Sequence, residues 1–197
     1  MPSDGNRLIE IRIHGRGGQG SVVAAYLIAT AALEDGRYGQ AFPSFGPERR
    51  GAPVTAFVRI ADRPVRRRCQ VVAPRFLLVQ DEGLLHGNVT DGLAPRGAIL
   101  VNSARDSSAL GVGRSFDVAA IPATALALEI LGRPVPNTAL VAAFLSLTGL
   151  LRPQSLDSAL ARQFRGETLD RNLRLVREAA RLVPAGAWKE LCDGAAA

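Results

Sequence analysis

The residues with the clearest chemical potential form a glycine-rich segment, GRGGQG, at positions 15–20. Its spacing is G-x-G-x-x-G, which allows a tight turn and lets a ligand approach the backbone closely. A helix that begins at such a turn offers unpaired backbone N–H groups to a phosphate. We therefore expect phosphate or acidic-group binding here, by the candidate residues Gly15, Arg16, Gly17, Gly18, Gln19 and Gly20.

Two other interpretations of this turn stay open. A dinucleotide site also needs an acidic residue about 20 positions further on, at the end of the second strand, to hold the ribose. That region is rich in proline here, and Glu34 and Asp35 lie at the expected helix end instead. A NAD site is therefore disfavoured. The remaining alternative is that the glycines serve only close packing between strand and helix.

A second segment, PSFGPERRGAP at 43–53, carries one anionic and two cationic side chains. We expect residues 37–53 to form an irregular loop, because prolines and glycines interrupt them, and long irregular loops are usually functional. Arginine is suited to bidentate capture of carboxylate or phosphate. The alternative is an internal salt bridge from Glu48 that stiffens the loop. The candidate residues are Ser44, Glu48, Arg49 and Arg50.

Several other kinds of site are excluded or disfavoured. The chain has two cysteines, Cys69 and Cys192, which excludes a disulfide scaffold, a zinc finger and an iron–sulfur cluster held by this chain alone. A phosphate-binding loop of the G-x-x-x-x-G-K-[ST] type is missing. We expect Cys69 to be a packed thiol, and no metal site is predicted. His14 ends the first expected strand and could reach the ligand edge of the sheet.

The net charge of +6 invites a nucleic-acid interpretation, which the residue types disfavour. The arginines are scattered, and two tyrosines and one tryptophan offer few stacking surfaces. A solvated surface, or a face that meets phosphates or an acidic partner, explains the excess as well. We interpret Arg66, Arg67 and Arg68 as a solvated edge, and favour a phosphate or partner contact for Arg16.

Hydrophobic patterning places these segments on an alternating set of elements. Residues 8–14 alternate as a strand, 21–36 follow as a helix, and the apolar runs 76–80 and 97–102 are typical of buried parallel strands. Further strands are expected at 54–60 and 115–121, a hairpin strand at 66–72, and helices at 121–133, 137–151 and twice within 153–182. The pattern predicts a three-layer α/β/α domain with a mixed, mostly parallel sheet and a Rossmann-like glycine turn.

We expect one domain over residues 1–184 and a loose tail over 185–197. The first residues do not have the pattern of a signal peptide, and the longest apolar stretches, about ten residues, are too short to cross a bilayer. The sequence therefore predicts a cytoplasmic protein.

At this point the motifs carry a resemblance. GRGGQG (15–20), YGQAFPSFGPERRGAPV (38–54), GAILVNS (97–103) and ALEILGRPVPNTALVAAF (127–144) resemble, in matching order, the gamma subunit or gamma domain of 2-oxoacid:acceptor oxidoreductases. This is the thiamine diphosphate and iron–sulfur family that includes pyruvate:ferredoxin oxidoreductase. The resemblance runs over about residues 8–180. The glycine turn combined with the second segment is its most specific part.

The resemblance implies an activity that this chain shares with other subunits. In the family, a 2-oxoacid is decarboxylated on thiamine diphosphate with Mg, electrons leave through [4Fe-4S] clusters, and the acyl group usually passes to coenzyme A. The chain lacks a G-D-G…N thiamine motif and the cysteines for a cluster. The resemblance therefore implies a subunit that is inactive alone and binds no redox cofactor. Its partners are alpha and beta thiamine-binding subunits, a delta-type iron–sulfur subunit and, in some complexes, a flavin subunit.

Carried over to this sequence, the resemblance places the glycine turn near coenzyme A or a partner, and places Ser44, Glu48, Arg49 and Arg50 at the subunit junction. Two alternatives remain: a stand-alone Rossmann-type nucleotide-binding module, and the related indolepyruvate oxidoreductase subunit. The sequence does not distinguish pyruvate from branched-chain or aromatic 2-oxoacids. Nor does it specify the acceptor, ferredoxin or NAD, or the stoichiometry of the complex.

Overall fold

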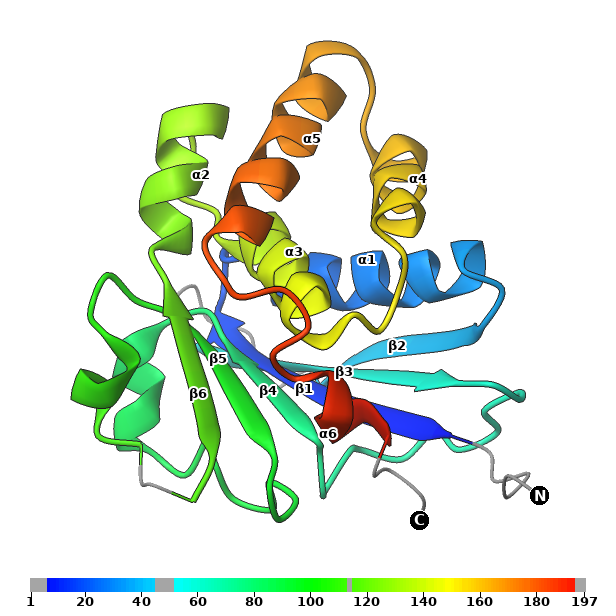
Figure 1. The fold of residues 1–197 in the computed structure, drawn as a ribbon, viewed down its shortest axis with the longest axis vertical. Helices are drawn as coiled ribbons and strands as arrows, with labels where there is room; N and C mark the ends of the chain where they lie inside the picture. Colours follow the sequence, from blue (N-terminus) through cyan, green and yellow to red (C-terminus); the bar gives the residue numbers. More distant parts are fainter. Residues whose placement is uncertain (1–6, 45–51, 113–114, 194–197) are drawn as a thin grey trace.

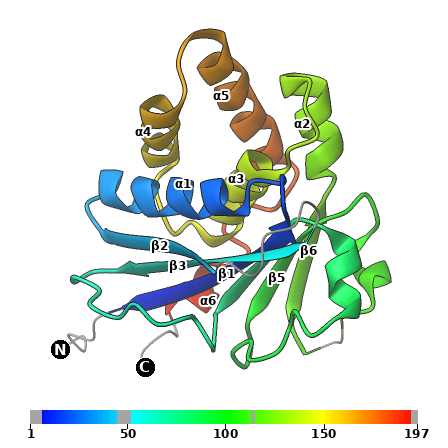
Figure 2. The ribbon, with the colours of Figure 1, turned by 180° about the vertical axis from the view of Figure 1, so that it is seen from behind.

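The computed structural model describes residues 7–44, 52–112 and 115–193 (Figures 1 and 2). They form a six-stranded sheet in the order β2-β3-β1-β4-β5-β6. The strands are β1 (Leu8–Arg16), β2 (Tyr38–Ser44), β3 (Pro53–Ala61), β4 (Phe76–Val79), β5 (Ala98–Asn102) and β6 (Asp117–Ile121). β1, β4, β5 and β6 run parallel to one another, and β3 pairs antiparallel with both β1 and β2. The predicted α/β class with a mixed, mostly parallel sheet is confirmed.

Helices cover one face of this sheet. They are α1 (Ser21–Glu34), α2 (Ala123–Leu131), α3 (Asn137–Thr148), α4 (Pro153–Gln163) and α5 (Gly166–Arg181). Figures 1 and 2 show all five on the same side, with α1 and α3 next to the strands and α4 and α5 above them. The main hydrophobic core lies between this layer and the sheet. None of the described helices is both long and apolar enough to span a membrane.

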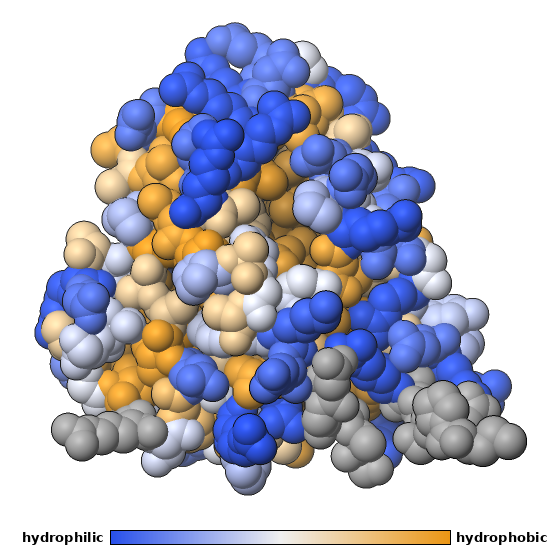
Figure 3. Space-filling view, viewed as in Figure 1, coloured by the Kyte–Doolittle hydropathy of each residue, from blue (hydrophilic) through white to orange (hydrophobic). Residues whose placement is uncertain are grey.

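The opposite face carries a smaller apolar cluster and a polar region. Over the described residues, two short 3₁₀ helices, η1 (Glu82–His86) and η2 (Ser107–Leu110), flank β4–β6 there, together with loops rather than long α-helices. The third layer of the predicted α/β/α arrangement therefore consists of 3₁₀ helices and loops. Leu77, Val79 and Ile99 are fully buried members of this cluster. In the view of Figure 3, hydrophilic residues cover the α4–α5 end of the molecule, and apolar residues show between the helices.

The prediction of an irregular loop over residues 37–53 is wrong for its first half, because residues 38–44 form strand β2. β2 pairs with β3 on one side only, so Pro43 lies at an edge, where strands tolerate proline. Gly39 allows α1 to lie directly on this strand: a Cβ there would be 2.2 Å from the carbonyl oxygen of Ala29. The hairpin of the sheet is therefore β2–β3.

The predicted hairpin strand at 66–72 is also wrong, because this segment forms a loop. Its carbonyl groups bind the buried Arg59 of β3 instead of a neighbouring strand. The guanidinium donates to the carbonyl oxygens of Arg67 at 3.3 Å, Cys69 at 2.8 Å and Gln70 at 3.4 Å. Cys69 is exposed rather than packed. Arg66, Arg67 and Arg68 are exposed, as expected for a solvated edge.

The loose tail expected from residue 185 is wrong for residues 185–193. The backbone N–H groups of Gly186 and Trp188 donate to carbonyl oxygens at the end of α3, each at 2.8 Å. Trp188 is 5% exposed and stacks on Phe76 of β4, with ring centroids 6.2 Å apart. A short helix, α6 (Lys189–Asp193), follows and buries Cys192. This segment is part of the main core, and residues 194–197 lie outside the described residues.

Candidate functional site

The glycine turn leaves the sheet at the carboxyl end of β1. Arg16 closes the turn twice: its backbone N–H donates to Oε1 of Gln19 at 2.7 Å, and its carbonyl accepts from the Gln19 N–H at 3.1 Å. Gly18 (φ +100°) and Gly20 (φ +78°) have positive φ angles, which glycine adopts most readily. α1 then begins at Ser21, so its unpaired N–H groups lie at this edge of the sheet.

Two of the glycines have a packing role that the structure makes explicit. A Cβ on Gly15 would lie 2.4 Å from Oγ of Ser21 and 2.8 Å from Oε1 of Gln80, and a Cβ on Gly20 would lie 2.5 Å from Nδ2 of Asn137. The packing interpretation therefore applies to Gly15 and Gly20. Gly18, by contrast, has open space around it, which leaves its backbone accessible to a ligand.

The two acidic residues at the carboxyl end of α1, Glu34 and Asp35, attach this helix to α4. Oδ1 of Asp35 accepts hydrogen bonds from Nε of Arg152 and from Oγ of Ser155, both at 2.7 Å, and Glu34 pairs with Arg162 at 2.5 Å. These carboxylates attach α4 to the far end of α1. Neither lies at the turn where a dinucleotide ribose would be held, in agreement with the disfavoured NAD interpretation.

Arg16 extends across the boundary between β1 and β4. Its Nε donates to Oδ2 of Asp81, the second residue after β4, at 2.6 Å. Oδ1 of the same carboxylate accepts the backbone N–H of Gly83 at 2.9 Å. The side chain of Arg16 remains 40% exposed. It is therefore oriented by Asp81 and still reaches solvent at the point where the strand order reverses, which is where open α/β sheets bind ligands.

The two signature segments are the glycine turn at 15–20 and the segment at 43–53. They meet at this edge of the sheet. Strand register pairs Arg16 with Pro53, and the N–H of Gly17 donates to the carbonyl oxygen of Ala52 at 3.0 Å. Ser44 is opposite Thr55 of β3, and its Oγ accepts from Nε2 of Gln70 at 3.2 Å. The Pro53 end of the second segment thus lies beside the glycine turn, whereas Ser44 lies on the other side of β3 from β1. Glu48, Arg49 and Arg50 lie outside the described residues, so their roles stay predictions.

The carboxyl ends of β4 and β5 supply polar side chains that sequence reasoning did not single out. Gln80 is fully buried; its Oε1 accepts from Ser21 Oγ at 3.2 Å, whereas its Nε2 has no hydrogen-bond partner within the described residues. Asn102 donates to the Gln80 carbonyl at 2.8 Å and to Thr124 Oγ1 at 2.7 Å. Ser103 donates to Glu82. The sequence does contain a signal for these residues, because each apolar strand is followed by polar side chains (FLLVQDE, AILVNS).

His14 lies on the sheet face opposite α1, next to Arg12. The Nε atom of Arg12 donates to Nε2 of His14 at 2.8 Å. The Nη2 atom of Arg12 donates to the carbonyl oxygen of Asp91 at 2.6 Å. Burial, and then the positive charge of Arg12, lowers the pKa of His14 to about 4. The imidazole is therefore neutral at pH 7. Both residues line a cavity of about 410 Å³ that Ser44 also reaches.

This pKa predicts an acid-sensitive stability. An unfolded chain binds a proton at His14 near pH 6.5, but the folded chain only near pH 4, so the folded state loses stability as pH falls through this window. We expect the protonation of His14 to lower the free energy of unfolding by about 3 kcal/mol between pH 7 and pH 4. Urea unfolding of the wild type and His14→Gln at several pH values tests this. Equal pH slopes for the two chains contradict it.

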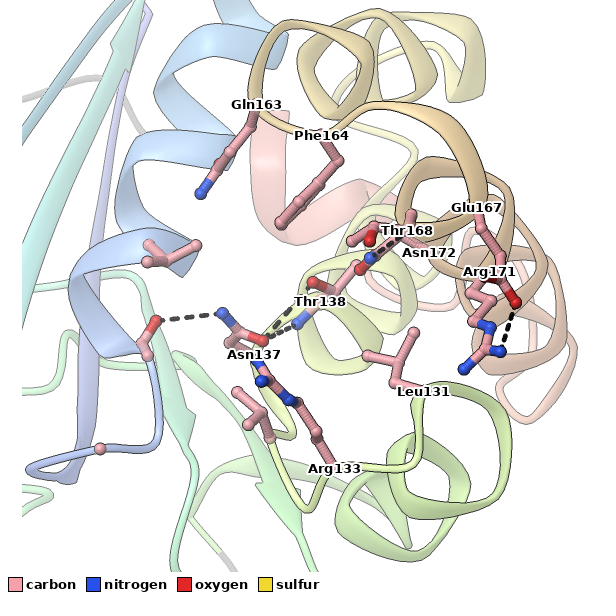
Figure 4. A pocket seen from close by; sticks show the side chains of 14 residues that line it. Leu131, Arg133, Asn137, Thr138, Gln163, Phe164, Glu167, Thr168, Arg171 and Asn172 are labelled. Carbon is pink, nitrogen blue, oxygen red and sulfur yellow. Dashed lines mark hydrogen bonds and ion pairs between the residues drawn. The ribbon is translucent and has the colours of Figure 1, made fainter.

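A second cavity, of about 510 Å³, lies on the helical side of the turn (Figure 4). Gly18 and Gly20 form one wall, where Nδ2 of Asn137 donates to the Gly20 carbonyl at 3.4 Å. Asn137 is the first residue of α3 rather than its cap; its Oδ1 accepts the N–H of Thr138 at 2.8 Å. The two cavities lie on opposite faces of the sheet, and only the second is lined by the glycine turn.

These features define a class: an α/β domain that presents a glycine turn, a helix N-terminus and an oriented arginine at the switch point of its sheet. Comparison with known proteins then specifies the family. The family model for pyruvate ferredoxin/flavodoxin oxidoreductase matches residues 10–182. The chain belongs to this family and is a gamma-type member of it, as the resemblance implies.

Individual relatives agree with this assignment. The chain is 46% identical over 168 residues to pyruvate synthase subunit PorC of Methanocaldococcus jannaschii, covering 85% of this chain and 92% of the relative. It is 44% identical over 176 residues to the pyruvate/ketoisovalerate oxidoreductases common subunit gamma of Pyrococcus furiosus, covering 87% and 95%.

Solved structures share the fold. The pyruvate oxidoreductase subunit PORC of Thermotoga maritima superimposes with a TM-score of 0.81 at 35% identity, covering 91% of this chain and 99% of that one. A 2-oxoglutarate:ferredoxin oxidoreductase from Magnetococcus marinus contains the same fold, with a TM-score of 0.76 at 21% identity, over 89% of this chain and 31% of its own length.

Proposed function

We propose that this chain is the gamma subunit of a multisubunit thiamine diphosphate and iron–sulfur 2-oxoacid oxidoreductase, which oxidatively decarboxylates a 2-oxoacid to an acyl-CoA. The observation that supports this most is the family match over residues 10–182, combined with a sheet edge at which both signature segments meet. Electrons pass to ferredoxin, or to NAD through a flavin subunit. The complex is cytoplasmic.

The redox cofactors of this complex are proposed to reside on other chains. A [4Fe-4S] cluster is held by four cysteine thiolates, and this sequence has two cysteines, one of them buried against α3 and the other exposed in the 66–72 loop. The chain's residues therefore do not fit a cluster. Its partners in the proposal are the alpha and beta subunits, which hold thiamine diphosphate and Mg, and a delta-type subunit, which holds the clusters.

The chain's own part in the reaction is to position coenzyme A and to pack against the thiamine-binding subunits. Coenzyme A carries phosphates, which suit an arginine beside a helix N-terminus. Arg16 and the first turn of α1 supply this pair next to Gly18. Ser44, Glu48, Arg49 and Arg50 are proposed to contact the partner subunits or coenzyme A, as the resemblance implies. The solved oxidoreductase from Magnetococcus marinus, which contains this fold, has 2-oxoglutarate, coenzyme A and succinyl-CoA bound.

Substitution of Arg16 tests this placement in the assembled complex. Because a charge-assisted hydrogen bond contributes about 1.5–3 kcal/mol, we expect Arg16→Ala to raise KM for coenzyme A at least about tenfold. Asp81→Asn keeps the arginine but weakens its orientation, so we expect a smaller increase. Arg177→Ala, an exposed arginine of α5, is the matched control. Initial rates of viologen reduction at saturating 2-oxoacid measure these values; an unchanged KM in Arg16→Ala contradicts the placement.

The assignment as a whole is tested by omission. The purified full chain should not reduce an acceptor with any 2-oxoacid, whereas adding it to the other purified subunits should restore coenzyme A-dependent activity. Acceptor reduction by the chain alone contradicts the proposed division of labour. Full activity of the other subunits without this chain contradicts its place in the complex.

A further inference from the structure

The sheet face opposite the helices carries a basic segment that the proposed function does not use. Residues 62–73 connect β3 to β4 and contain four arginines and one aspartate, a net charge of +3 against +6 for the whole chain. In Figures 1 and 2 this segment, coloured between cyan and green, runs on the side of the sheet away from α1. The aspartate, Asp62, pairs with Arg37 at 2.9 Å. The positive charge of the segment is therefore not balanced from within it.

Three of these arginines are available to a partner. Arg66, Arg67 and Arg68 are exposed, and over the described residues their guanidinium groups make no hydrogen bond or ion pair. The backbone carbonyl groups of the same stretch accept hydrogen bonds from the buried Arg59. The acceptor groups of the loop thus face the protein, whereas its guanidinium groups are in contact with solvent.

The loop that carries these arginines is fixed at both ends. Arg59 is 1% exposed and pairs with Glu10 at 2.7 Å, so a buried ion pair lies beneath the arginine run. Gly92 packs against the other end, because a Cβ there would lie 2.1 Å from the carbonyl oxygen of Val72. A solvated arginine run needs neither contact. An ordered loop loses less conformational entropy when a partner binds, which favours docking.

Two large side chains with apolar surface are exposed beside the arginines. Val72 is 75% exposed and Tyr38 is 45% exposed. Tyr38 lies two residues before Gln40 on β2, whose Oε1 accepts from Arg59, so the side chains of Tyr38 and Gln40 face away from α1. The cavity of about 410 Å³ opens next to Val72 and hollows the surface there. Arginine and tyrosine are enriched in protein–protein interfaces, whose centres are apolar.

Charge and position together indicate the kind of partner. Carboxylates pair with guanidinium groups through two parallel hydrogen bonds. A nucleic acid also supplies anions, but its bases need stacking surfaces, and Val72 offers an aliphatic surface instead. Nε2 of Gln70 in this segment donates to Oγ of Ser44, the residue that the resemblance places at the subunit junction. A carboxylate-rich protein surface on another subunit satisfies both observations.

We propose that this basic face, formed by residues 62–73 with Tyr38, docks a carboxylate-rich surface of another subunit of the complex. The exposed arginines pair with carboxylates of that subunit, and Val72 and Tyr38 are buried against its apolar side chains. The existence of the complex is taken from the proposed function, whereas the surface and the chemistry of the contact are new. The face does not include Arg16, so it is separate from the coenzyme A contact proposed above.

Binding of the full chain to the other purified subunits, measured by interferometry at several salt concentrations, tests the proposal. The test variant replaces three arginines of the loop: Arg66→Gln, Arg67→Gln and Arg68→Gln. The matched control removes the same charge from exposed positions of α5: Arg174→Gln, Arg177→Gln and Arg181→Gln. The loop variant should bind at least about tenfold more weakly at low salt, with a flatter salt dependence, and the control should bind as the wild type does. Equal affinities of the two variants overturn the proposal.

Two other residues of the face give independent readouts. Val72→Asp places a carboxylate against those of the partner and should weaken binding at least about tenfold, whereas Leu128→Asp, at an apolar position of α2 that is 54% exposed, should not. Cys69 is exposed and Cys192 is 1% exposed, so iodoacetamide labels the loop selectively in the folded chain. Binding of the other subunits should protect Cys69 from this labelling. Labelling of Cys69 at the same rate in the complex as in the free chain overturns the proposal.

The remaining outcomes separate the partner classes and the two proposals. If a short DNA duplex binds the isolated chain at physiological ionic strength as tightly as the subunits do, and the loop variant loses that binding, the partner is a nucleic acid and the proposal is overturned. If the wild-type chain does not bind the other subunits, both proposals fail. If the wild type and the loop variant bind and restore activity equally, the proposed function stands and the docking surface alone is wrong.

Discussion

Replacing Arg59 by alanine is expected to lower the free energy of unfolding by about 3–5 kcal/mol, the usual cost of breaking a buried ion pair. Arg59 is 1% exposed in the middle of β3. Its Nε donates to Oε1 of Glu10 on β1 at 2.7 Å, and its other nitrogens bind carbonyl groups of the 66–72 loop. Its removal leaves Glu10 and these carbonyls without their partner, and creates a cavity in addition.

Two further variants serve as controls. One separates the charge of Arg59 from its hydrogen-bonding geometry, and the other removes an exposed arginine of the same region. Arg59→Lys keeps the positive charge but lacks the planar fork that reaches both the carboxylate and several carbonyls, and it weakens the contact with the Phe42 ring, 5.3 Å from the guanidinium. We expect its loss to be intermediate. Arg66→Ala, at an exposed position of the loop, should change stability by about 0.5 kcal/mol or less. Urea unfolding followed by circular dichroism measures all three. A loss in Arg59→Ala no larger than in Arg66→Ala contradicts this role.

The same residue connects the fold to the candidate site. The loop that Arg59 holds includes Gln70, whose side chain donates to Oγ of Ser44, and the following residues line the cavity next to His14. Because the 66–72 loop does not pair with a strand, its hydrogen bonds to Arg59 are what hold it in place. The buried guanidinium therefore replaces the hydrogen bonds of a strand ladder and positions one wall of the cavity next to His14.

The sequence predicts best where local chemistry and burial agree. β1, the turn and α1 were predicted because alternation, glycine spacing and an alanine-rich run all favour the same unit. β2 was missed because glycine weakens a strand and proline within a sheet is largely confined to edge strands, and edge position depends on the pairing of the whole sheet. The 66–72 loop was missed because its acceptor groups are satisfied by one side chain from elsewhere in the chain.

The candidate site shows the same division. The glycine turn could be recognised from spacing alone, but the orientation of Arg16 depends on Asp81, which lies 65 residues away and arrives there through the parallel register of β1 and β4. The meeting of the two signature segments likewise follows from the antiparallel register of β1 with β3. The helical cavity combines five helices, so no single sequence window could indicate it.

Trp188→Ala is expected to destabilise the protein by about 3–5 kcal/mol, the range found when a buried aromatic side chain is truncated. The residue lies beyond α5 in a segment with little hydrophobic periodicity, which is why the sequence indicated a loose tail. Its ring is nonetheless 5% exposed and stacks on Phe76, which itself meets Phe144 of α3 edge-on with centroids 5.2 Å apart. Removing it takes an aromatic layer out of the core.

Matched variants make this test specific. Trp188→Phe keeps a ring against Phe76 and should lose much less stability, whereas Leu182→Ala, 49% exposed just before the segment, should lose about 0.5 kcal/mol or less. Because Trp188 is the only tryptophan, unfolding is followed by circular dichroism rather than by fluorescence. If Trp188→Ala unfolds at the same urea concentration as Leu182→Ala, the segment contributes nothing to the core. The expected difference makes residues 185–193 a structural part of the domain, which a truncation at residue 184 would remove.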